Sequence, residues 1–234
     1  IFEEGNLSGL PFTFNREVTE VFEDMINRSV PGYRTSLRLI TLFTKHYYQS
    51  DTTCYDIGCS LGASSLSMLQ AKKDVKIIAI DNSEAMIEAC KNRFQNLPQS
   101  QSIQFLQQDV MEVELDNASI IVLNYLIQFL DLEQRERLFD KIFSALLPGG
   151  ILILSEKIHY KNSFESKRIF RTHHKFKSIN GYSDLEISGK RDSLEGVLIT
   201  EPEEDHFSRG ARAGFKSSTK ILSNLNFRTF IFCK

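Results

Sequence analysis

The chain has 234 residues, of which 41% are hydrophobic and 25% charged; these are the proportions of an ordinary globular protein and exclude a disordered, collagen-like or coiled-coil chain. This length predicts one large domain, or one domain with an insertion. The net charge of −2 argues against direct nucleic-acid binding, because phosphate contacts need an excess of Lys and Arg.

The first part of the chain predicts a cap rather than part of a sheet. Residues 1–14 lack periodicity and contain glycine and proline, so we expect an arm there. Apolar residues then recur at helical spacing over 16–25 and over 35–48, on either side of a break at Pro31-Gly32. We therefore assign 1–49 to an N-terminal arm and cap helices.

From residue 50 onward, short apolar runs alternate with helical patterns. The runs predict buried strands at 53–57, 76–80, 103–106, 119–123 and 151–154. The helical patterns between them lie at 63–71, 83–94 and 132–146. This alternation predicts an α/β fold, in which a parallel sheet with right-handed crossovers has helices on both faces. We assign 50–156 to this core.

The C-terminal part predicts a different pairing. Two apolar runs, 215–222 and 227–232, are separated by a short polar turn and predict an antiparallel hairpin. The sheet is then expected to have seven strands, mostly parallel, and to be completed by residues 209–234.

Between the core and the hairpin lies a basic stretch. Residues 157–195 contain nine Lys or Arg against five acids, together with three histidines. We assign 157–208 to a basic helical insertion.

Membrane and metal sites are not expected. No apolar run approaches the roughly 20 residues that span a bilayer. The four cysteines are scattered and form no CxxC pair, which disfavours a structural zinc site and favours a reduced, cytoplasmic compartment.

A glycine-bearing turn follows the first strand of the core. The segment Asp56-Ile57-Gly58-Cys59-Ser60-Leu61-Gly62 connects that strand to a helix. Glycine permits a sharp bend and a close approach of a ligand to the backbone, and ligands of open α/β sheets bind beyond these strand ends. The G-x-x-x-G spacing differs from the G-x-G-x-x-G of dinucleotide sites. A strand-to-helix turn without a ligand is the alternative.

Polar residues follow three further strands. Asp81 ends the second strand, where its carboxylate can accept two hydrogen bonds from a ribose diol; the alternative is a helix N-cap. Asp109 follows the third strand, where an adenine amino group would be recognised, and the alternative is a turn. Asn124 ends the fourth strand, next to the expected reaction centre. Together these strand ends predict a nucleoside pocket without a pyrophosphate site.

This combination resembles the Rossmann-like fold of S-adenosylmethionine-dependent methyltransferases over 50–156 and the terminal hairpin. The flanking segments resemble a narrower family, the carboxy-S-adenosyl-L-methionine synthases, over nearly the whole chain. The segments that carry this likeness are VFEDMINRSVPGY at 21–33, YDIGCSLGA at 55–63, LSEK at 154–157, HHKFK at 173–177, NGYS at 180–183 and LEISGKR at 185–191.

The resemblance implies an activity and a site. Enzymes of that family convert S-adenosylmethionine and prephenate to carboxy-S-adenosylmethionine and phenylpyruvate, and a second enzyme uses the product to carboxymethylate the wobble uridine of tRNA. Ten residues are implied to contact the nucleoside: Tyr33, Gly58, Cys59, Ser60, Asp81, Asn82, Asp109, Val110, Asn124 and Arg191. The resemblance also implies a homodimer, in which the insertion at 157–208 covers the active site and contributes to the dimer contact. A functional link to a tRNA carboxymethyltransferase and the absence of a metal are implied as well.

The family likeness assigns Arg191 the catalytic role of holding the new carboxylate, since a guanidinium can donate two parallel hydrogen bonds to it. A solvated surface arginine is the alternative. Other basic residues of the insertion, with His173 and His174, are candidates for holding prephenate, and interface roles are the alternative for both histidines. No protein nucleophile is expected, and a substrate carboxylate is a hypothesis for the base.

Three departures from the family pattern concern the substrate side. Gly189 stands where the family has Gln, Leu126-Ile127 stands where it shows Thr-Leu, and the hairpin is the least similar part. Two other functions remain open from the sequence. One is a methyltransferase acting on a small molecule or tRNA, and the other is a non-catalytic tRNA-binding scaffold, which only the basic insertion supports.

Overall fold

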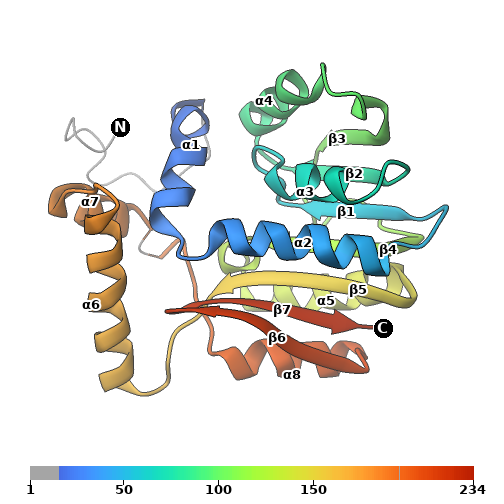
Figure 1. Ribbon diagram of the computed structural model, residues 1–234. Helices are drawn as coiled ribbons and strands as arrows, with labels where there is room; N and C mark the ends of the chain where they lie inside the picture. The colour runs from blue at the N-terminus through green and yellow to red at the C-terminus, as the bar shows by residue number, and fades with distance from the viewer. Residues whose placement is uncertain (1–15, 195) are drawn as a thin grey trace.

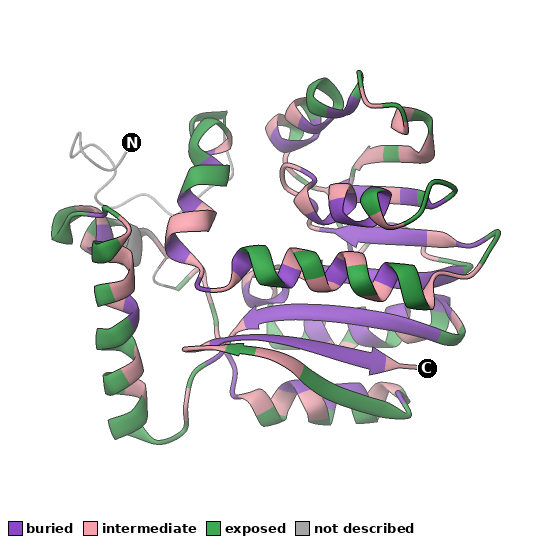
Figure 2. Cartoon of the chain, in the orientation of Figure 1, coloured by how far each residue is buried: buried purple, intermediate pink, exposed green. Residues whose placement is uncertain are grey.

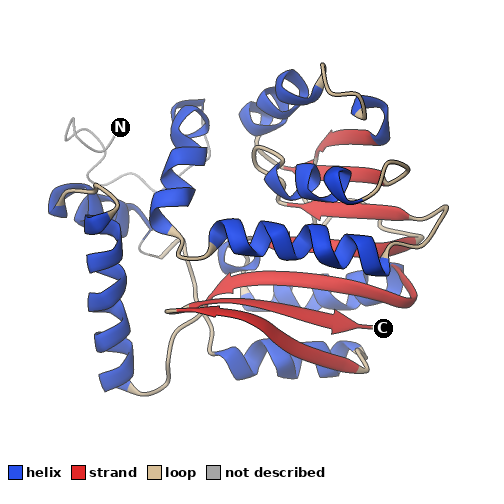
Figure 3. Cartoon of the chain, viewed as in Figure 1, coloured by secondary structure: helices blue, strands red, loops and turns tan. Residues whose placement is uncertain are grey.

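The computed structural model describes residues 16–194 and 196–234, without the side chains of 190–193; the predicted arm at 1–14 lies outside them. Figures 1 and 3 show helices packed around one sheet. The helices are α1 (Arg16–Ser29), α2 (Tyr33–Tyr47), α3 (Ala63–Ala71), α4 (Glu84–Phe94), α5 (Leu132–Ala145), α6 (Ser163–Ile179), α7 (Asp184–Leu194) and α8 (Glu203–Ala213), with short 3-10 turns at Ser100–Ser102 and Ile127–Phe129. The strands are β1 (Thr53–Ile57), β2 (Lys76–Asp81), β3 (Ile103–Gln107), β4 (Ala118–Asn124), β5 (Leu146–Lys157), β6 (Ser217–Asn224) and β7 (Phe227–Cys233).

The sheet confirms the predicted fold class. It has seven strands in the order β3-β2-β1-β4-β5-β7-β6. The first five pair in parallel, and β7 pairs antiparallel with both β5 and β6. Because the strand order reverses between β1 and β4, the carboxyl ends of these strands flank the place where open α/β sheets bind ligands.

Two elements differ from the prediction. Strand β5 begins at Leu146, so Pro148-Gly149-Gly150 lies inside the strand rather than in a break before it. The pairing with β4 shifts register there, as expected at a bulge, which accommodates proline and glycine. Helix α8 was not predicted, and it crosses the predicted boundary at 208/209. Its buried residues include His206 and Arg209, so polar side chains lie on its inward face and an apolar pattern does not mark it.

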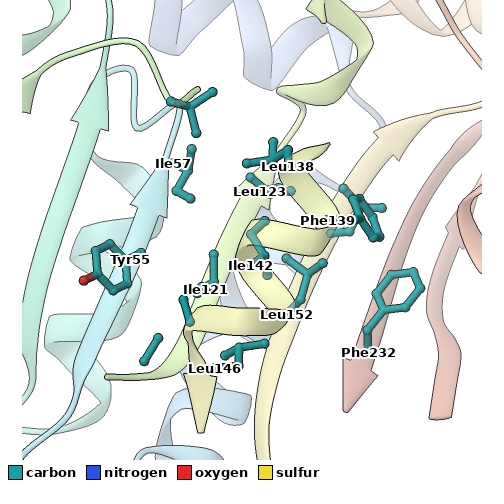
Figure 4. Packing of buried hydrophobic residues seen from close by; sticks show 14 of the residues in the cluster. Tyr55, Ile57, Ile121, Leu123, Leu138, Phe139, Ile142, Leu146, Leu152 and Phe232 are labelled. Carbon is teal, nitrogen blue, oxygen red and sulfur yellow. The ribbon is translucent and has the colours of Figure 1, made fainter. Parts of the chain in front are cut away.

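The core lies on both faces of the sheet. One cluster fills the space between the sheet and α5, and Figure 4 shows Leu138, Phe139 and Ile142 of that helix pointing toward the side chains of β4, β5 and β7. A second cluster joins the other face to α2, α3 and α4. Figure 2 shows the central strands buried, whereas β6 is largely exposed and polar, as expected of an edge strand that avoids further pairing.

The insertion and the first helix form a separate group beside the sheet. Helices α1, α6 and α7 gather at the left of Figure 1, next to the strand ends, and α1 contacts α6. None of the helices in the described ranges has the length and apolarity needed to cross a membrane.

Candidate functional site

Two adjoining cavities lie beyond the carboxyl ends of the parallel strands. The first, of about 370 Å³, is walled by α1, α6 and the loop after β4. The second, of about 270 Å³, lies between α1, α2 and the glycine turn. Nine of the ten predicted nucleoside contacts line one or both: Tyr33, Gly58, Cys59, Ser60, Asp81, Asn82, Asp109, Val110 and Asn124. The tenth, Arg191, lies on α7, and its side chain is outside the described part of the structure.

The glycine turn brings backbone to the cavity wall. The N–H groups of Gly58 and Cys59 both donate to the carbonyl of Ile80, at 2.8 and 2.9 Å. Gly58 has a φ of 71°, and a Cβ there would lie 2.8 Å from Leu126 Cδ1. Ser60 adopts a φ of 47° without being glycine. A non-glycine residue held in this region is strained, and such strain is concentrated at ligand sites.

Asp56 anchors this turn from behind. Its Oδ2 accepts hydrogen bonds from the N–H of Ser65 at 2.8 Å and from the Ser65 hydroxyl at 2.6 Å. Burial raises the pKa of Asp56 to about 6, and the bonds from Ser65 oppose that rise. The carboxylate therefore holds the start of α3 against the end of β1, although Asp56 itself does not line either cavity.

Asp81 orients its carboxylate through two backbone groups. Oδ2 accepts from the N–H of Ser60 and Oδ1 from the N–H of Ser83, both at 2.9 Å. The N-cap of α4 is Ser83, whose hydroxyl accepts from the N–H of Met86. The alternative assignment of Asp81 as the helix N-cap is therefore wrong. Each carboxylate oxygen keeps a second lone pair, and Asp81 can therefore still accept from a ligand in the cavity it lines.

Asp109 and Asn124 differ in which of their hydrogen-bonding atoms already have a partner in the protein. Asp109 is exposed, and its Oδ1 accepts from the N–H of Met111 at 2.7 Å. It therefore makes the hydrogen bond of a turn residue, which was the alternative for this position, and it also lines the cavity. Asn124 donates from Nδ2 to the Ser64 hydroxyl at 3.1 Å. Its Oδ1 is buried and has no partner within the described residues. Because a buried acceptor without a partner is costly, this oxygen suits a donor on a bound ligand.

Glu156 supports the site but was not predicted to belong to it. It is 1% exposed at the end of β5, and its Oε1 accepts from the N–H of Ile127 at 2.8 Å. The loop that it holds includes Leu126 and Gln128, which line the cavity. Burial raises the pKa of Glu156 to about 8, opposed by the Ile127 hydrogen bond. The only sequence signal was a carboxylate at the end of a buried strand.

We expect the Glu156→Gln variant to lose much of the protein's pH dependence of stability. Because the pKa of Glu156 is raised on folding, the folded state binds that proton more tightly than the unfolded state. The free energy of unfolding of the wild type should therefore fall by more than about 2 kcal/mol as the pH rises from about 5 to about 8. Urea unfolding across this pH range measures the slope. The exposed control Glu112→Gln should keep the wild-type slope, and an unchanged slope in Glu156→Gln would contradict the assignment.

The two adjacent histidines differ. His173 lines the cavity, and its Nε2 lies 2.8 Å from the carbonyl oxygen of Ser29, so it ties α6 to α1. The ring of Phe227 packs edge-on against it at 5.0 Å. His174 Nε2 lies 3.7 Å from a carboxylate oxygen of Asp184 on α7. These contacts favour roles in holding the insertion together.

A buried cluster of charged side chains lies behind the wall of the first cavity that includes Leu130. Glu201 accepts from Arg135 and, at 2.6 Å, from Arg209. Arg135 also donates to the carbonyls of Leu130 and Ile199. Burial alone would raise the pKa of Glu201, but the hydrogen bonds from the two arginines bring it below its usual value. Since Leu130 lines the cavity, this cluster fixes the position of the wall.

Within the described residues, no group of three or more His, Cys, Asp or Glu side chains is arranged to hold a metal ion. The fit to a nucleoside is better supported. Gly58, where a Cβ would clash with Leu126, and the Asp81 carboxylate both line the first cavity. Asn124 lines it as well, and its Oδ1 has no hydrogen-bond partner among the described residues.

The sequence is similar to one family model and to curated enzymes. Residues 55–150 match the family model described as a methyltransferase domain. The carboxy-S-adenosyl-L-methionine synthase of Yersinia enterocolitica is 41% identical over 225 residues, which are 95% of this chain and 85% of that protein. The enzyme of the same name from Citrobacter koseri is 42% identical over 95% of this chain and 91% of its own length.

Solved structures share the fold at low identity. Human N-acetylserotonin methyltransferase, solved in complex with SAM, superposes with a TM-score of 0.62 at 13% identity, over 94% of this chain and 55% of its own. An O-methyltransferase family protein from Burkholderia thailandensis gives a TM-score of 0.64 at 12% identity, over 94% and 60%. At these identities the likeness concerns the fold alone.

Proposed function

The chain belongs to the carboxy-S-adenosyl-L-methionine synthase family, and on this premise we propose that it converts S-adenosylmethionine and prephenate to carboxy-S-adenosylmethionine and phenylpyruvate. The observation that carries the proposal is the convergence of Gly58, Asp81, Asp109 and Asn124, from four strand ends, on one cavity. A nucleoside is bound by hydrogen-bond acceptors and by backbone that approaches it closely. Unlike a dinucleotide, it needs no pyrophosphate site.

The described residues suggest how the substrate would be held. The Asp81 carboxylate would accept from the ribose hydroxyls, and the Asn124 oxygen would accept from a donor near the sulfonium end. Apolar residues complete the wall, among them Phe22, Met25 and Val197. Because an apolar enclosure excludes water, it protects a reactive carbon from protonation.

The proposed reaction balances without an oxidant or a protein nucleophile. The sulfonium makes the methyl protons of S-adenosylmethionine acidic, so that this carbon can form a bond to CO2. Prephenate supplies the CO2 as its ring becomes aromatic, and it also loses hydroxide. The methyl proton and the hydroxide leave together as water. Holding both substrates in one cavity replaces an improbable encounter with a positioned one.

Mass spectrometry of the nucleoside formed from S-adenosylmethionine and prephenate tests this proposal. A product heavier than the starting nucleoside by one CO2, formed together with phenylpyruvate, is the expected result. S-adenosylhomocysteine with a methylated acceptor would instead support the second candidate, a methyltransferase acting on a small molecule or tRNA, which the methyltransferase-domain match favours.

We expect Arg191→Ala to weaken binding of the carboxylated nucleoside far more than binding of S-adenosylmethionine. A guanidinium–carboxylate pair is worth about 1.5–3 kcal/mol, so the ratio of the two dissociation constants should change by about tenfold or more. Calorimetric titration with each nucleoside measures that ratio. Lys190→Ala is the neighbouring control, and equal weakening of both nucleosides by Arg191→Ala would show that the carboxylate is held elsewhere.

The setting of the enzyme is also a proposal. We propose a cytoplasmic homodimer whose product serves a tRNA carboxymethyltransferase. Exposed apolar side chains on the insertion support the dimer: Phe164, Phe170 and Ile179 on α6 and Leu185 on α7, since exposed apolar clusters mark interaction surfaces. The four cysteines are free thiols, in keeping with a reducing compartment. Sedimentation at several concentrations tests the dimer.

A further inference from the structure

A third cavity, of about 550 Å³, lies between α6 and α7. It shares Lys157, His173, Lys177, Leu194 and Leu198 with the cavity that holds the nucleoside contacts. The two lysines therefore stand where the two spaces meet.

Within the described residues, the two lysines lack counter-charges. Lys157 is the last residue of β5 and Lys177 lies in the last turn of α6, and both are only partly exposed. Across the described ranges, neither ammonium group makes an ion pair or hydrogen bond with a protein group. Burial lowers the pKa of both lysines. The pKa of Lys177 falls to about 8, first through burial and second through the charge of Lys157.

Such an arrangement is unfavourable for the folded protein alone. Two cations from different elements are brought close in a partly desolvated space, where like charges repel and each loses hydration. Groups kept in an unfavourable state by the surrounding fold are concentrated at functional sites. An anion bound between them would relieve both costs.

Resting on the proposed function, we infer that Lys157 and Lys177 bind a carboxylate group of the second substrate, the dicarboxylate prephenate. The nucleoside carries a sulfonium and meets the acceptors Asp81 and Asn124, whereas prephenate carries two negative charges and meets the two lysines. The first cavity thus carries groups that match both substrates, acceptors for the cation and ammonium donors for the anion. This arrangement orients the acid toward the methyl carbon of the nucleoside.

Two variants test the inference, Lys177→Met and Lys157→Met, which keep an unbranched side chain one atom shorter and remove its charge. Each should raise the apparent KM for prephenate by about tenfold or more, since a hydrogen bond from a charged group is lost. The dissociation constant for S-adenosylmethionine should stay within about twofold of the wild type. The melting temperature should not fall, because the repulsion between the lysines is removed.

The control is Lys175→Met on the same helix, where the lysine is exposed; it should change neither constant. Lys177→Arg, which keeps the charge, should retain part of the prephenate affinity. If the wild type makes no carboxylated nucleoside from prephenate, the proposed function fails. If the wild type is active and Lys177→Met and Lys157→Met keep its KM, the lysine inference alone fails. A lower melting temperature with equal loss of nucleoside affinity would also overturn it, in favour of a structural role.

Discussion

Replacing Asp81 by alanine is expected to weaken the binding of S-adenosylmethionine by about 100-fold or more, because the two charge-assisted hydrogen bonds that we propose to the ribose would be worth about 3 kcal/mol together. The substitution also removes the acceptor for the N–H of Ser60. That residue is held at a φ of 47° in the cavity wall, so its backbone is expected to relax away from the ligand. Calorimetric titration of the folded variant measures the loss.

Asp74→Ala is a matched control for this experiment. Asp74 is exposed and lies just before the start of β2, whereas Asp81 lies at the carboxyl end of that strand. Its removal should leave the dissociation constant unchanged within about twofold. Wild-type affinity in a folded Asp81→Ala protein would place the ribose elsewhere and remove the basis of the nucleoside assignment.

Replacing Glu201 by glutamine is expected to lower the free energy of unfolding by about 3–5 kcal/mol, because it leaves buried positive charge uncompensated. The side chains of Arg135 and Arg209 are 1% and 3% exposed, so water cannot replace the lost carboxylate. Urea unfolding at neutral pH measures the change. Because Arg135 also holds Leu130 and Ile199, the variant should bind the substrates more weakly as well.

Glu204→Gln is the control for the cluster. Glu204 pairs with Lys161 at 3.6 Å, but both side chains are about two-thirds exposed. An exposed pair of this kind contributes about 0–1 kcal/mol. If Glu201→Gln were no less stable than Glu204→Gln, the buried cluster would not be holding the wall of the cavity.

Most of the fold could be predicted because the core strands are continuous apolar runs. Strand β4 is buried at every position except Asn124, so its hydropathy alone marks both the strand and its polar end at the cavity. Helix α8 could not be found in this way. His206 and Arg209 are buried in it through contacts with Phe230, Glu136 and Glu201, and such polar burial follows from tertiary partners that a local pattern does not contain.

The residues of the candidate site also fall into two groups, those that the sequence could predict and those that it could not. Asp81 and Asn124 were predictable because each directly ends an apolar run, and parallel strands bring their carboxyl ends to one edge. Glu156 also ends such a run, but its role depends on the N–H of Ile127, 29 positions earlier in the chain. The pairing of Lys157 with Lys177 needed the position of α6 beside the strand ends, which no spacing in the sequence specifies.

The transfer of an isotopic label from one substrate to the other tests the central claim most directly. The protein would be incubated with S-adenosylmethionine and prephenate carrying carbon-13 in its ring carboxylate, in the presence of excess unlabelled bicarbonate. The account predicts that the carboxylated nucleoside retains the label, because in the proposed reaction CO2 passes within one cavity from the acid to the methyl carbon. Unlabelled product would mean that CO2 enters from solution, and the absence of any carboxylated product would contradict the proposed function itself.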